Sequence, residues 1–118
     1  MKTLEQTRAF LTSQGFDGPQ KLGYSEGLLY YRRIEGSPCL SNDKLQLTVQ
    51  VFDMDLNNGT MKHQTATVEI TGEYREGTWA KLGVYAVSWD TLLTDLDTIT
   101  ADVLRAWEAI YQHKAVNP

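Results

Sequence analysis

The sequence predicts a single α+β domain over residues 1–118, with an N-terminal helix, a four-stranded antiparallel meander and a long C-terminal amphipathic helix packed on one sheet face. Three observations predict this fold. A helix-capping pattern begins at residue 3, apolar and polar residues alternate strictly in 45–51 and 65–74, and from residue 90 the apolar period becomes about 3.6. A chain of this length can bury a core without a disulfide or metal.

The N-terminal helix has both a start signal and a stop signal. The Thr3 hydroxyl can accept from the Gln6 amide while the Gln6 side chain returns to the Thr3 amide, which is a capping box. Gly15 suits the left-handed position after a helix, and Phe16 can then contact Leu11. Residues 17–19, Asp-Gly-Pro, are expected to form a turn or loop.

Four segments have strand character. Residues 28–34 are rich in β-forming side chains, residues 45–51 alternate, and residues 65–89 form one long hairpin around the loop 75–77, where Gly77 supplies the positive φ. This loop predicts the facing pairs Ile70–Leu82, Val68–Val84 and Ala66–Ala86. The short connection near Asn57 and Gly59 joins the second strand to the hairpin, so the strands form a meander.

The second arm of the hairpin is apolar on both sides. Its core side carries Leu82, Val84 and Ala86. The opposite side is expected to carry Trp79, Tyr85, Val87 and Trp89, which we call the aromatic row. Three interpretations compete. The N-terminal helix or the loop at 36–43 covers the row, or the row binds a second copy or another protein, or it lines a pocket for a small apolar ligand.

The C-terminal helix is predicted from Asp90 nearly to the end of the chain. Its apolar stripe includes Leu92, Leu96, Val103 and Trp107, and this stripe must be covered by the sheet. The segment at 97–98 allows a kink or a second start, since aspartate caps helices and threonine is a mediocre helix former.

Composition excludes several classes of protein. A net charge of −4, with the basic residues scattered, argues against nucleic-acid binding, which needs clustered Lys and Arg. No apolar run reaches the roughly 18 residues of a membrane span, and residues 1–5 lack the apolar region of a secretory signal. The single cysteine, Cys39, excludes an internal disulfide, which fits a reducing compartment. Together these observations lead us to expect a cytoplasmic protein that does not bind membranes.

Few residues suggest chemistry. Asp53, Asp55 and Asn57 alternate oxygen side chains ahead of a turn, which is a weak match to a calcium loop because the spacing of the later ligands is wrong. Glu69 and Glu73 share one strand face, but four residues of strand separate them by roughly 13 Å, which is wider than the gap between the paired carboxylates of a glycosidase. We expect both to lie on the solvated face, with Lys81 as a partner. No phosphate loop, nucleophile elbow or dinucleotide fingerprint occurs, and no cofactor is expected.

The sequence therefore predicts a non-enzymatic protein-interaction module, of an adaptor, chaperone-like or inhibitor kind, that acts through the aromatic row. The partner is either another protein or a second copy in a homodimer. The alternative is a small-molecule binder or minor enzyme with a pocket between the sheet and the C-terminal helix, lined by Tyr30, Tyr31, Trp107 or Tyr111.

Overall fold

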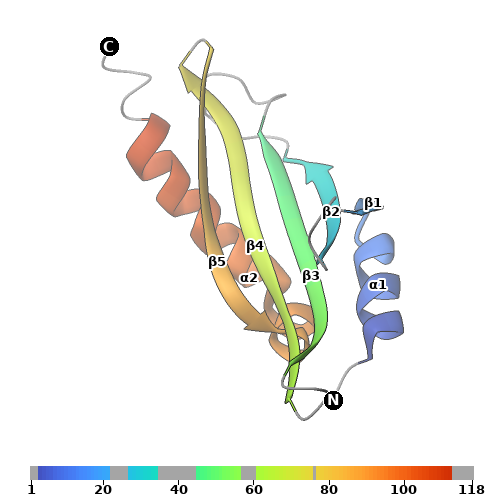
Figure 1. Cartoon of the computed structure of the whole chain (residues 1–118). Coiled ribbons are helices and arrows are strands. Elements are labelled where there is room, and N and C mark those ends of the chain that lie inside the picture. Colours follow the sequence, from blue (N-terminus) through green and yellow to red (C-terminus); the bar gives the residue numbers. More distant parts are fainter. Residues whose placement is uncertain (1–2, 22–26, 35–44, 57–60, 76, 113–118) are drawn as a thin grey trace.

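The computed structural model describes residues 3–21, 27–34, 45–56, 61–75 and 77–112 (Figure 1). They form an α+β fold in which one helix precedes and one follows, along the chain, five antiparallel strands in the sheet order β1-β2-β3-β4-β5. Each strand is hydrogen-bonded to its neighbour in the chain, so β1 and β5 are the two edges. The elements are α1 (Leu4–Ser13), β1 (Asp17–Lys21), β2 (Gly27–Arg33), β3 (Gln46–Leu56), β4 (Met61–Arg75), β5 (Thr78–Ser88), α2 (Trp89–Trp107) and a π-helical turn η2 (Glu108–Gln112).

The sheet has one strand more than the sequence predicted. Residues 17–19 were expected to form a loop, but β1 pairs with β2, with Asp17 facing Tyr31 and Lys21 facing Leu28. All five residues of β1 are exposed, so they carry no apolar alternation by which a strand could be recognised. Pro19 is tolerated because an edge strand leaves one row of its amides unpaired.

Helix α1 begins and ends as predicted. Gln6 N donates to Thr3 Oγ1 at 3.1 Å, and Thr3 N donates to Gln6 Oε1 at 2.9 Å. At the other end Gly15 has a φ of +84°, and Phe16 N donates to Leu11 O at 3.1 Å, as in a Schellman ending. This ending turns the chain directly into β1 and buries Phe16 beside Leu11.

The hairpin of β4 and β5 follows the predicted register over most of its length. The pairs Ile70–Leu82 and Val68–Val84 are confirmed. The third predicted pair is wrong, because Ala66 faces Val87 and not Ala86. Two residues of β5, Tyr85 and Ala86, lie between paired positions where β4 has only Thr67, and Ala86 has a φ of +59°. This β-bulge reverses the face on which every later residue of β5 points.

Helix α2 follows the bulge with no intervening loop. Ser88 caps it, since Ser88 Oγ accepts from Thr91 N at 3.1 Å. The helix runs without a break through 97–98 to Trp107, so the second start allowed by the sequence is not formed. None of the helices in the described ranges is long and apolar enough to cross a membrane.

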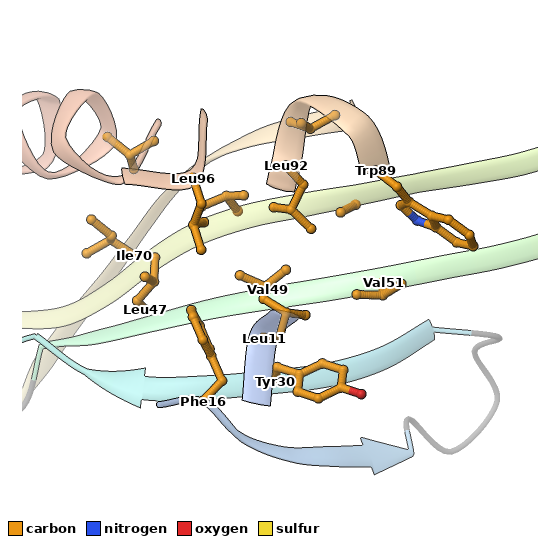
Figure 2. Packing of buried hydrophobic residues seen from close by; sticks show 14 of the residues in the cluster. Leu11, Phe16, Tyr30, Leu47, Val49, Val51, Ile70, Trp89, Leu92 and Leu96 are labelled. Carbon is orange, nitrogen blue, oxygen red and sulfur yellow. The ribbon is translucent and has the colours of Figure 1, made fainter. Parts of the chain in front are cut away.

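Both helices cover the same face of the sheet and share one core with it. Figure 2 shows Leu92 and Leu96 of α2 pointing into the cluster that also holds Leu11 of α1. Trp107 closes the other end of α2 against β4, where a side chain at Gly72 would collide with Leu45 and lie 2.9 Å from the Trp107 ring. The buried apolar residues are Leu11, Phe16, Tyr30, Leu45, Leu47, Val49, Val51, Ala66, Val68, Ile70, Val87, Trp89, Leu92, Leu96, Val103 and Trp107.

Candidate functional site

The structure divides the predicted aromatic row into two halves. Trp79 and Tyr85 are 54% and 62% exposed and lie on the sheet face away from the helices. Val87 and Trp89 are only 8% and 3% exposed and belong to the core. The expectation that all four share one outward face is therefore wrong for the second pair.

The bulge and the helix start explain why Val87 and Trp89 are inside. Counting every second residue from Trp79 assumes an unbroken strand, whereas the extra residue at Ala86 turns Val87 toward the core opposite Ala66. Trp89 is the first residue of α2, and its Nε1 donates to Thr65 O at 3.1 Å, which satisfies the indole while the ring is buried.

The outward face next to Trp79 and Tyr85 is polar but tightly packed. The Glu69 carboxylate lies 3.5 Å from Lys81 Nζ, which confirms the predicted pair. Glu69 and Glu73 are nevertheless buried and not solvated as expected. Gly83 explains the first case, because it faces Glu69 and has no side chain, so the Glu69 side chain lies across it.

On the helix side of β5 an open groove of about 230 Å³ is lined by residues of the strand and of α2. Val84 lies at its margin and is 40% exposed, although it faces Val68 in the core register. The groove is lined by Leu82, Gly83, Val84, Asp102, Val103 and Ala106. A pocket between the sheet and the C-terminal helix was the alternative expected from the sequence, but the residues that line this groove are not the aromatic residues expected there.

The edge of β5 itself completes the site. No strand lies beyond β5 among the described residues, so its outward row of N–H and C=O groups has no partner strand there. We call the combination of this backbone row, the exposed rings of Trp79 and Tyr85, and Val84 with its groove the β5 edge surface.

The four aromatic residues suggested for a small-molecule pocket do not line this groove. Tyr30 is buried, and its hydroxyl accepts from Arg8 Nε at 3.1 Å. Trp107 is fully buried over β4 and β5, and the Tyr111 ring lies 5.3 Å from it between centroids. Tyr31 is half-buried on β2, on the opposite sheet face from Tyr30.

The weak calcium motif falls on the β3 strand and beyond it. Asp53 lies in regular strand, exposed, and its Oδ1 accepts from Gln64 Nε2 at 3.1 Å. The side chain of Asp55 and the whole of Asn57 lie outside the described residues, as does Cys39. Within the described part of the chain, no group of three or more His, Cys, Asp or Glu residues is placed to hold a metal ion.

Comparison with protein-family models, with curated proteins and with solved structures finds no match to this chain.

Proposed function

We propose that this protein is a non-enzymatic interaction module that binds another polypeptide along the β5 edge surface. One observation carries the proposal: an eleven-residue edge strand with a single charged side chain, Lys81, exposes two large aromatic rings. Exposed Trp and Tyr residues are the side chains most often found at the energetic centre of protein interfaces. An adaptor, a chaperone-like protein or an inhibitor would each use such a surface.

The geometry favours binding of an extended segment. A strand added to the free edge of β5 gains main-chain hydrogen bonds along its length, and its alternate side chains then point to the two sheet faces. On one face these side chains meet Trp79 and Tyr85, and on the other they enter the groove beside Val84. The two faces thus offer apolar contacts at the same strand.

Photo-crosslinking in the native host tests the proposal. Benzoylphenylalanine at position 79 or 85 is expected to yield a discrete protein adduct, while the same group at position 20, exposed on the opposite edge strand β1, yields none. The adduct formed from position 79 should disappear when Val84→Lys places a charge on the β5 edge.

Absence of an adduct at both 79 and 85 would contradict the proposal. An adduct of equal yield at position 20 would also contradict it, because the binding would then not depend on β5.

A further inference from the structure

We infer that the polypeptide bound by β5 is β5 of a second copy, paired antiparallel about a two-fold axis at Leu82. This inference rests on the proposed function and names its partner. It would join two five-stranded sheets into one continuous sheet, with no edge left open at the join.

The side chains of β5 are self-complementary in this register. An axis at Leu82 places Trp79 of one copy opposite Tyr85 of the other, and each copy contributes one such pair. Both rings lie on the outward face and are more than half exposed in a single copy. Facing aromatic residues on neighbouring strands are a favourable cross-strand pair. On the helix side, Ala80 would face Val84 of the second copy.

The charges are complementary in the same register. Lys81 faces Gly83 of the second copy, and the side chain of Glu69 lies across that glycine: a Cβ on Gly83 would be 2.5 Å from Glu69 Cγ. Lys81 can therefore reach Glu69 of the second copy as well as its own Glu69, 3.5 Å away.

Neighbouring registers lose these features. An axis at Lys81 would set the only charge of β5 opposite itself, which is unfavourable. An axis at Gly83 would set Trp79 opposite Val87, which has turned into the core beyond the bulge. Leu82 is thus the axis at which the exposed rings and the charges both find partners.

The helix layer also fits. Helix α2 packs against both β4 and β5. In a continuous sheet the two α2 helices would be separated by two strand spacings, or roughly 10 Å, which is the ordinary distance between packed helices. The groove, which Val103 and Ala106 line on the side of α2, would then lie between the two helices and be covered by the second copy.

The buried area is sufficient for a stable dimer. The symmetric overlap runs from Thr78 to Ala86, a strip about 30 Å long, and a sheet plus a helix layer is about 20 Å thick. Each copy would bury about 600 Å², or roughly 1,200 Å² in total, above the roughly 1,000 Å² expected of a biological interface.

Cysteine crosslinking in a Cys39→Ser background tests both the partner and the register. Trp79→Cys and Tyr85→Cys proteins are mixed and treated with a thiol-bridging reagent about 5 Å long, which matches the Cβ separation of facing residues. The mixture should give crosslinked dimer, and neither variant alone should, because position 79 lies roughly 20 Å from position 79 of the other copy. The mixed dimer keeps one Trp79–Tyr85 pair intact.

Light scattering of the unmodified chain provides the second readout. The expected mass is twice the 13.3 kDa of one chain. A mass of one chain at 100 μM, or crosslinking by Trp79→Cys alone, would overturn the inference. If the chain is monomeric but photo-crosslinks at position 79 to a different protein, this inference fails while the proposed function stands.

Discussion

The two edges of the sheet are built in opposite ways. The β1 edge is five residues long and irregular, every residue in it is exposed, and it contains Asp17, Pro19 and Lys21. The β5 edge is eleven residues long, and its exposed side chains include Trp79 and Tyr85. Among the described residues neither edge has a further strand paired to it, so the difference lies in the side chains and length of the two edge strands.

Short length, charge, irregular pairing and proline are the features by which edge strands avoid adding another strand. The β1 edge has all four. The β5 edge has one charge, Lys81, and its ion pair with Glu69 holds that charge over the sheet. Its bulge lies near the C-terminal end, so a long stretch of the strand stays regular. The contrast is the reason for proposing β5, and not β1, as the edge that binds a partner.

The largest expected effect concerns the support beneath the β5 edge. Trp107→Ala should lower the free energy of unfolding by about 4 kcal/mol, because it empties the space over Gly72 and removes the Nε1 bond to Ala80 O. Urea denaturation followed by circular dichroism measures the change. Ile110→Ala in the adjoining turn is the control, and its exposed side chain should lose about 1 kcal/mol or less. Equal losses would show that Trp107 does not anchor this edge.

The second test compares the two edges directly. Val84→Lys should weaken association at least about tenfold, or about 1.4 kcal/mol, because a charge enters the middle of the β5 edge. Gln20→Lys places the same charge on β1 and should leave association unchanged. Sedimentation analysis of both variants gives the dissociation constants. Val84 is 40% exposed, so a lysine there can extend into water and the fold is retained. A weakening by Gln20→Lys of the same size would remove the distinction between the edges.

A smaller effect tests how the β1 side is held. The Arg32 guanidinium carbon lies 4.5 Å from the Phe16 ring centroid, and Arg32 Nη1 donates to Gln14 O at the end of α1. Arg32→Met should cost about 1 kcal/mol of stability through loss of the cation–π contact and of the helix-end bond. The neighbouring Arg33→Met is the matched control, since Arg33 is exposed and should change stability by less than about 0.5 kcal/mol. Thermal unfolding curves of the two variants would contradict this account if they coincide.

The smallest effect concerns the one charge on β5. Lys81→Gln should change stability by no more than about 0.5 kcal/mol, because Lys81 is mostly exposed and its ion pair with Glu69 is screened by solvent. It should also reduce the salt dependence of association, since Lys81 reaches Glu69 of the second copy in the proposed dimer. Lys21→Gln on β1 should change neither quantity. A salt dependence unaltered by Lys81→Gln would argue against the proposed register.

Signals confined to a few residues predicted this protein well. The capping box at Thr3 and the glycine stop at Gly15 are satisfied by neighbours within five positions, so no other part of the fold is needed to recognise them. The alternation in β3 and β4 identified the core face, because a period of two in a strand leaves only one way to bury the apolar side chains. Two of the three predicted hairpin pairs follow from the same rule.

The candidate site was predicted only in part, for a physical reason. Trp79 and Tyr85 precede the bulge and lie where alternation puts them, whereas Val87 and Trp89 follow it and do not. Nothing local marks Ala86, a residue that rarely takes a positive φ, as the inserted position. A pocket between the sheet and the C-terminal helix was expected, but the residues that line the groove beside Val84 were not predicted, because they come together only when α2 packs across β5.

By itself the sequence determined the fold class, the start and end of α1, the core faces of β3 and β4, and the presence of surplus aromatic side chains on the last strand. Only the tertiary structure decided that β1 is a strand, that the bulge at Ala86 returns Val87 and Trp89 to the core, and that Trp79 and Tyr85 stay outside on an open edge. The former depend on contacts between close neighbours in the chain. The latter depend on which strands and helices lie side by side, and that is settled by packing across the whole domain.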